Sequence, residues 1–225
     1  MHKYGDLWQP DDEKQAMQLV LNETDPDLFE ASGRRQAEDL LCPRIRRTDV
    51  VMDLGCGIGR VARYVARCCG TLWAVDASER MLSLARERLE GLPNISFARS
   101  EGTGIPSIER GSVDFVYSIL TLRHLEREDA FLLLRDVHRV LRPGGSAFFT
   151  FPNLLSDVYL NAFLDYAEGG EVGNPARARF YTPEEVRRVL PAAGFDLINL
   201  TAGVEIEVDC ARGADSRPSA SAPEA

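Results

Sequence analysis

Strand-like and helix-like segments alternate along the chain from residue 49 onward. Apolar runs at residues 50–54, 72–75, 95–98 and 113–118 have the length of buried strands, and apolar residues at helical spacing follow several of them. This order is typical of a parallel sheet covered by crossover helices. It predicts an α/β fold of the doubly wound kind, with helices on both faces of the sheet.

Three further strands are predicted at residues 146–151, 195–200 and 204–208, and the last two are expected to pair antiparallel. A helix is expected between the first two of these strands. Thr182 is its predicted cap, Pro183 takes the first helical position, and Glu185 closes a capping box. The complete prediction is a mostly parallel, seven-stranded sheet with an antiparallel last strand.

The length and composition fit a single domain, because 225 residues of which 44% are hydrophobic can bury one core of ordinary size. We expect this domain to cover residues 34–210, after a polar cover segment at 1–33. Aromatic residues at helical spacing, followed by two glycines, indicate a lid insertion at 153–179. Residues 211–225 are almost wholly small, charged or proline, and predict a disordered tail.

The bulk chemistry narrows the possible partners. A formal charge of -9 disfavours nucleic acid as a partner, since the averaged field repels phosphate backbones. Apolar runs are too short to cross a bilayer, and no signal sequence is evident. Five cysteines lack the spacing of a zinc site or a disulfide framework, so no metal is expected and a reducing, cytoplasmic location is predicted. None of these features specifies an oligomeric state.

A glycine-rich turn, Asp53-Leu54-Gly55-Cys56-Gly57-Ile58-Gly59, lies between a predicted buried strand and an amphipathic helix. Glycine allows a ligand to approach the backbone there. Asp76 ends the next strand, about 20 residues further on, where a carboxylate can accept both ribose hydroxyls. A tight turn beside a solvated acid is the structural alternative. The combined context favours an adenosine-type ligand.

A nicotinamide dinucleotide is the first competing ligand. Its pattern wants a third glycine where Arg60 stands, because the helix must approach a pyrophosphate closely. Asp53 lies two residues before the first glycine, where a negative charge suits an ammonium better than a phosphate. The ligand should therefore carry positive charge.

Residues 51–59 resemble the first motif of class I S-adenosylmethionine-dependent methyltransferases. Residues 74–78 are similar to the ribose-binding motif of that family, 97–106 to its adenine-binding loop, and 139–145 to a later landmark. The resemblance covers about residues 34–202 and implies S-adenosylmethionine as the cofactor. It also implies a set of cofactor-binding residues, namely Gly33, Arg34, Asp53, Gly55, Gly57, Asp76, Ala77, Glu101, Gly102 and Ser118.

Within that set, the resemblance implies a role for each part. Gly55 and Gly57 would approach the methionine part, Asp76 would hold the ribose hydroxyls, and Ala77 would pack on the adenine. Glu101 and Gly102 would face the adenine edge, although the family usually has Asp where Glu101 stands. The Ser118 carbonyl would face the ammonium, while Gly33 and Arg34 would contact the carboxylate. A surface arginine at a helix is the alternative for Arg34.

The catalytic and acceptor residues are less constrained. His124 is the candidate general base, since histidine titrates near neutrality, with a structural loop histidine as the alternative. In the family two histidines end this segment, whereas Arg123 replaces the first here. Tyr4, Leu7 and Trp8 form one candidate acceptor wall. The other candidate acceptor residues, for which ordinary core packing is the alternative, are Tyr159, Phe163, Tyr166 and Tyr181.

These features predict an enzyme that transfers a methyl group to oxygen or nitrogen of a small-molecule acceptor, whose identity no motif specifies. Two alternatives stay open. In the first, the protein binds the cofactor without catalysis and acts as a partner or regulator. In the second, it is a methyltransferase that acts on a macromolecule. A nicotinamide-dependent oxidoreductase is a third reading, which Arg60 disfavours.

Overall fold

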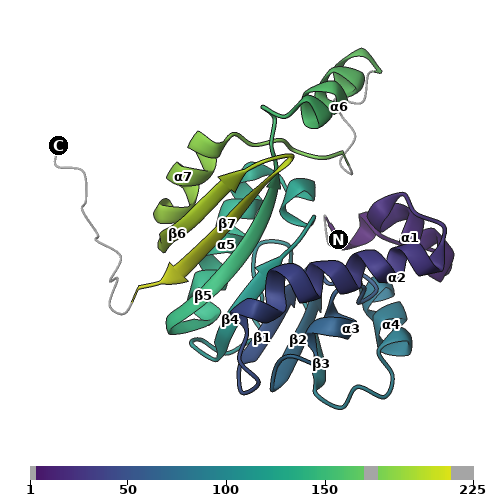
Figure 1. The fold of residues 1–225 in the computed structure, drawn as a ribbon, viewed down its shortest axis with the longest axis vertical. Coiled ribbons are helices and arrows are strands. Elements are labelled where there is room, and N and C mark those ends of the chain that lie inside the picture. Colours follow the sequence, from purple (N-terminus) through teal and green to yellow (C-terminus); the bar gives the residue numbers. More distant parts are fainter. Residues whose placement is uncertain (1–3, 170–176, 214–225) are drawn as a thin grey trace.

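The computed structural model describes residues 4–169 and 177–213, and its centre is a seven-stranded sheet in the order β3-β2-β1-β4-β5-β7-β6 (Figure 1). Strand β7 runs antiparallel to both of its neighbours, and the remaining pairs are parallel. The predicted fold class is confirmed. The strands are β1 (Val50–Leu54), β2 (Thr71–Asp76), β3 (Ile95–Arg99), β4 (Val113–Ser118), β5 (Leu141–Pro152), β6 (Phe195–Ala202) and β7 (Glu205–Arg212).

Helices cover both faces of the sheet, as alternating burial along the strands requires. Met52 and Leu54 of β1 join a core with α5 and α7, whereas Val51 joins a second core with η2, α3 and α4. The α-helices are α1 (Glu13–Leu21), α2 (Pro26–Arg35), α3 (Ala62–Val65), α4 (Glu79–Arg88), α5 (Arg127–Val140), α6 (Asp157–Glu168) and α7 (Pro183–Ala192). Short 3-10 helices are η1 (Gly5–Leu7), η3 (Cys42–Arg44) and η4 (Leu122–His124), and η2 (Gln36–Leu41) is a π-helix.

Side-chain caps that depend on neighbouring residues alone start two of the helices. The Ser78 hydroxyl accepts a hydrogen bond from the Met81 amide at 3.1 Å and starts α4. Thr182 and Glu185 form the expected reciprocal capping box of α7, with Pro183 in its first turn. Helix α7 therefore begins at the residue that the sequence predicted.

The helix after the glycine turn is shorter than its apolar spacing predicts, because α3 ends at Val65. Asn94, which precedes β3, donates its side-chain amide to the Ala66 carbonyl at 2.7 Å and to the Cys69 carbonyl at 3.4 Å. These two carbonyls are satisfied by a distant side chain instead of by a continuing helix.

The polar segment before the core forms two capped helices, α1 and α2. Asp12 caps α1 by accepting from the Gln15 amide, and Asp25 caps α2 ahead of Pro26. Helix α2 runs through the expected boundary between residues 33 and 34. At the other end, β7 extends to Arg212, and residues 214–225 of the expected tail lie outside the described residues.

Cys42 and Cys68 are joined by a disulfide, so the expectation of unpaired cysteines is wrong for this pair. The two residues are 26 positions apart and meet where η3 lies against the turn that follows α3. The free cysteines Cys56, Cys69 and Cys210 are buried. Within the described residues, every helix is too short or too polar to cross a membrane.

Candidate cofactor site

A cavity lies at the carboxyl ends of β1, β2 and β4. Parallel strands bring the loops that follow them to one edge, which is where ligands bind in open α/β sheets. Among the residues that line the cavity are Tyr4, Trp8, Asp53, Gly55, Gly57, Arg60, Asp76, Ala77, Ser100, Gly102, Thr121 and His124.

The glycine turn after β1 has a backbone that side chains rarely allow. Gly55 and Gly57 have φ angles of 82° and 54°. A Cβ atom on Gly55 would collide with the Thr121 side chain, which follows β4. The amides of Gly55 and Cys56 both donate to the Val75 carbonyl, at 2.7 and 2.9 Å. The turn is therefore held against β2, with its backbone facing the cavity.

Asp76 connects the end of β2 to this turn. One carboxylate oxygen accepts from the Gly57 amide and the other from the Ser78 amide, both at 2.9 Å. Burial raises the pKa of Asp76, and these backbone donors oppose the rise. Each carboxylate oxygen retains capacity for a second donor, so two neighbouring hydroxyls can be held there.

Asp53 and Arg60 place opposite charges on the same wall. Asp53 is 4% exposed, and burial raises its pKa to about 7, against the opposing effects of Tyr117 and Arg60. Arg60 is 5% exposed, and burial lowers its pKa to about 10. Arg60 therefore keeps its positive charge at neutral pH, whereas Asp53 titrates close to it.

The opposite end of the cavity is formed by the loop after β3 and by the segment before the core. Gly102 has a φ angle of 85°, and a Cβ atom on it would lie 2.6 Å from the Tyr4 ring. Tyr4 donates its hydroxyl to Asp129 and accepts from the Glu126 amide at 3.0 Å. The Trp8 ring meets His124 edge-on, with centroids 4.7 Å apart, and its carbonyl accepts from Ser78. These contacts hold Tyr4 and Trp8 on the cavity wall that also includes Ala77.

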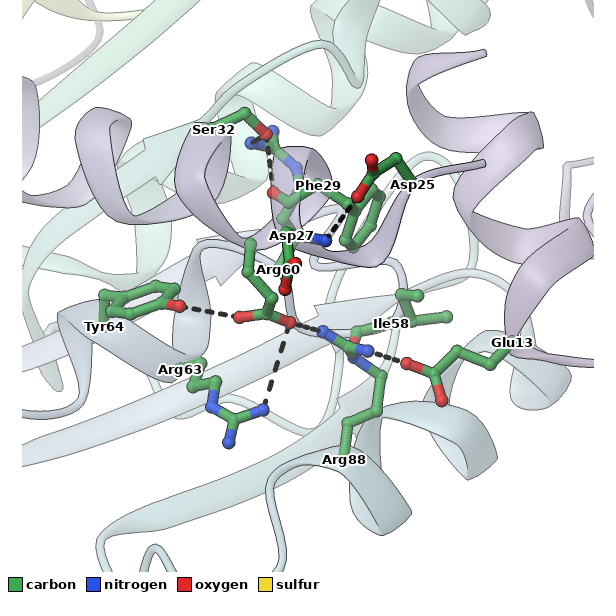
Figure 2. Close-up of polar contacts among 11 residues, drawn as sticks. Glu13, Asp25, Asp27, Phe29, Ser32, Ile58, Arg60, Arg63, Tyr64 and Arg88 are labelled. Atoms are coloured by element: carbon green, nitrogen blue, oxygen red, sulfur yellow. Dashed lines mark hydrogen bonds and ion pairs between the residues drawn. The ribbon is translucent and has the colours of Figure 1, made fainter. Parts of the chain in front are cut away.

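Charged contacts fix the covering segment to the core. Figure 2 shows Arg63, Tyr64 and Arg88 converging on one carboxylate, that of Glu30 in α2. Arg88 also pairs with Glu13 of α1 and donates to the Ile58 carbonyl of the glycine turn at 3.1 Å. Helices α1 and α2 are thus tied to α3, α4 and the turn itself.

The sequence pattern of a methyltransferase domain matches residues 51–145. The chain is 30% identical over 189 residues to methyltransferase GfsG of Streptomyces halstedii, which covers 78% of this chain and 63% of that protein. It is 34% identical over 118 residues to a demethylmenaquinone methyltransferase of Tropheryma whipplei, covering 52% of this chain and 47% of that protein. The chain thus spans less than two thirds of the length of either relative.

Solved structures agree at the level of fold. A Haloferax volcanii methyltransferase, in complex with its Trm112 activator, superposes with a TM-score of 0.69 at 16% identity, covering 90% of this chain and 98% of that one. Residues 51–145 match a methyltransferase domain, and the fold around them is that of the class I methyltransferases. Magnesium protoporphyrin IX methyltransferase from Synechocystis, solved with bound S-adenosylhomocysteine, gives a TM-score of 0.60 at 17% identity, with coverage of 89% and 85%.

A methyltransferase domain of this fold implies S-adenosylmethionine as the cofactor, and the cavity fits that molecule in three respects. Gly55 and Gly57 leave room for a methionine part, the Asp76 carboxylate can accept from ribose hydroxyls, and the small residues Ala77 and Gly102 line the wall where a flat base can lie. Charges of both signs lie near the glycine turn, as a zwitterionic amino-acid group requires.

Several expected cofactor residues lie away from the cavity. Arg34 is exposed and pairs with Glu38, while Gly33 packs against the Arg60 backbone. Glu101 is exposed, and its amide donates to the Gly104 carbonyl. Ser118 is fully buried and donates its hydroxyl to the Leu54 carbonyl at 2.8 Å, leaving the cavity wall to the next three residues, 119–121.

The expected acceptor residues divide into two groups. Tyr159, Phe163 and Tyr166 of α6 surround Phe180, with ring centroids 5.7 to 6.3 Å apart. Tyr181 lies in a separate hollow between α5 and α7, beneath the Arg127 guanidinium. None of the four lines the cofactor cavity, and the lid residues 170–176 lie outside the described part of the chain.

The structure also brings residues to the cavity that the motifs did not single out. Ser100 follows β3 directly and Thr121 lies three residues after the end of β4, so their position after a parallel strand was the available signal. From the sequence, Arg60 is informative only because its side chain disfavours a dinucleotide ligand. Its burial depends on α2 and η2, which no local pattern reveals.

Proposed function

We propose that this protein is an S-adenosylmethionine-dependent methyltransferase that methylates oxygen or nitrogen of a small-molecule acceptor. The observation that carries the proposal is the single cavity wall shared by the glycine turn, Asp76 and His124. The first two are suited to the cofactor, and the third supplies a titratable group beside it. Several relatives, among them a demethylmenaquinone methyltransferase and a ubiquinone-biosynthesis O-methyltransferase, are named for small-molecule acceptors, which supports a small acceptor here.

When bound, the cofactor supplies an electrophilic methyl group on a sulfonium. Gly55, Gly57 and Asp76 would hold the cofactor so that this methyl group can be presented to an acceptor lone pair. The protein has to align the acceptor and exclude water. Tyr4 and Trp8 would help to exclude water, because their rings line the cavity and Trp8 packs against His124.

His124 is the proposed base for an acceptor that must lose a proton. Its ring lies on the cavity wall against Trp8, and its position is fixed by backbone contacts of η4. The His124 amide donates to the Thr121 carbonyl at 3.0 Å, and its carbonyl accepts from Arg179 at 3.4 Å. The imidazole would receive the acceptor proton as the methyl group transfers.

The first experiment is release of S-adenosylhomocysteine when the protein and S-adenosylmethionine are mixed with fractionated small-molecule extracts. Release with one fraction would support the proposal and lead to the acceptor. Cofactor binding without release in any fraction would favour a macromolecular acceptor or an inert, cofactor-binding regulator. Absence of cofactor binding would contradict the proposal altogether.

Once an acceptor is known, His124→Gln should lower kcat about a hundredfold for a hydroxyl or ammonium acceptor and leave the cofactor Kd unchanged. His138→Gln is the matched control, because His138 lies in α5 against Phe195, outside the cavity. An unchanged kcat in His124→Gln would remove the base from the proposal while leaving methyl transfer intact.

A further inference from the structure

Arg60 is a buried cation on the wall of the cofactor cavity. It follows the glycine turn directly, is 5% exposed and lines the cofactor cavity together with Asp53. Among the described residues no carboxylate oxygen lies within ion-pairing distance of its guanidinium. Burying an unpaired charge is costly, and proteins usually offset that cost with a counter-ion.

Neutral groups hold the guanidinium in place. One terminal nitrogen donates to the Ser32 hydroxyl at 3.1 Å and the other to the Gln36 side-chain carbonyl at 2.7 Å. The Phe29 ring lies 5.8 Å from the guanidinium carbon, and Figure 2 shows Arg60 beside Ser32 and Phe29 of α2. The Nε atom is buried and has no hydrogen-bond partner. These contacts orient the charge without cancelling it.

The neighbouring helix is shaped to admit this arginine. A Cβ atom on Gly33 would lie 2.7 Å from Arg60 Cγ and closer still to its carbonyl oxygen. Gly33 therefore allows α2 to pack directly on the Arg60 backbone. The glycine that the family resemblance assigned to the cofactor contributes here by placing another residue.

Arg34 is poorly suited to the same task. Its side chain is 64% exposed and is paired with Glu38 at 2.8 Å across one helical turn. A solvent-exposed, already paired arginine gains little from a ligand carboxylate, because water screens the interaction. Arg60 combines charge, burial and a position on the cavity wall.

Asp53 completes the arrangement. It lies on the same wall, and its charge and that of Arg60 influence each other. An α-amino-acid group carries an ammonium and a carboxylate on one carbon, and so requires both signs within a few ångströms. We propose that Arg60 binds the carboxylate of the cofactor's methionine part, with Asp53 facing its ammonium. The inference rests on the proposed function.

The test compares two ligands that differ only in this part. S-adenosylhomocysteine has the amino-acid group, and 5′-methylthioadenosine lacks it. In Arg60→Met, the affinity for S-adenosylhomocysteine should fall at least tenfold by calorimetry, while the affinity for 5′-methylthioadenosine changes less than twofold. Arg34→Met is the matched control and should leave both affinities unchanged.

Equal losses for both ligands would show that Arg60 only maintains the cavity, and an unchanged affinity for S-adenosylhomocysteine would remove it from the site. Either result would overturn the inference. If Arg60→Met does not fold, Arg60→Lys keeps the charge but loses the planar donor geometry, and the same selective loss is expected. Failure of the unaltered protein to bind either ligand would instead contradict the proposed function itself, and the inference with it.

Discussion

At the scale of single residues, the acids near the carboxyl ends of β1 and β2 have different surroundings. Asp76 accepts from two backbone amides, which oppose the rise in its pKa on burial, whereas burial among side chains raises the pKa of Asp53 to about 7. The motif alone shows two acids near a glycine turn. Only packing shows that Asp76 is held by backbone donors and that Asp53 is poised to titrate.

Asp76→Ala should weaken binding of S-adenosylhomocysteine by about 1.5 to 3 kcal/mol, the usual worth of hydrogen bonds to a charged group. The variant loses both the expected ribose contacts and the acceptor for the Gly57 and Ser78 amides. Titration calorimetry would measure the change. Glu101→Ala is a useful control, because that exposed side chain lies off the cavity wall. An unaltered affinity in Asp76→Ala would exclude it from the site.

Asp53 predicts a pH dependence of stability in the ligand-free protein. Burial raises its pKa from 3.8 to about 7, so the fold disfavours the ionised form and stability falls as pH rises between these values. Urea unfolding at pH 5 and pH 7.5 should show this fall, and Asp53→Asn should reduce it. A fall of the same size in Asp53→Asn would assign it to other groups.

A second consequence concerns the cofactor. A ligand ammonium beside Asp53 favours the carboxylate and lowers its pKa, so binding near pH 6.5 should release a proton. Calorimetry in buffers of different ionisation enthalpy measures that release directly. Asp53→Asn should bind without it, and equal release by both proteins would contradict the assignment.

At the scale of elements, α6 and η4 are joined by one polar cluster. Arg123 of η4 pairs with Glu205 of β7 and donates to the Tyr159 hydroxyl at 2.8 Å, and Tyr159 also donates to Glu205. Figure 1 shows α6 standing apart from the other helices, and none of its described residues is buried. This cluster is therefore a main attachment of α6 to the segment that carries His124.

Glu205→Ala should lower the free energy of unfolding by about 2 to 3 kcal/mol, since it leaves a largely buried Arg123 without its counter-ion. Glu205→Gln, which keeps an acceptor, should cost less. Urea unfolding would measure both variants. Arg34→Ala, which removes an exposed pair, should leave unfolding unchanged. Equal behaviour of Glu205→Ala and Arg34→Ala would show that the cluster contributes nothing.

The helices and strands also show which structural features could be predicted from the sequence. Strands and caps were predictable, because periodicity and the Thr182 capping box depend on nearby residues. Site residues at the carboxyl ends of parallel strands, such as Gly55 and Asp76, were also predictable, because these ends meet at one edge of the sheet. The length of α3 depends on Asn94, and the positions of Arg34 and Arg60 depend on the rotation of α2. These are long-range packing effects with no local signal.

At the scale of the whole molecule, the Cys42–Cys68 disulfide closes a loop that contains β1 and the entire glycine turn. For a separation of 26 residues, the chain-entropy relation gives a stabilisation of about 3.5 kcal/mol. Cys42→Ser should therefore lower the Tm, and reductant should lower the Tm of the unaltered protein but not that of the variant. A Tm insensitive to both changes would show that the bond adds nothing in solution.

The contact between Tyr4 and Asp129 spans 125 residues of sequence. During synthesis Tyr4 therefore leaves the ribosome well before its partner exists, and β1 likewise waits for β4 to take its place in the sheet. Tyr4 also lines the cavity, so this part of the cavity wall can be completed only after α5 has been synthesised.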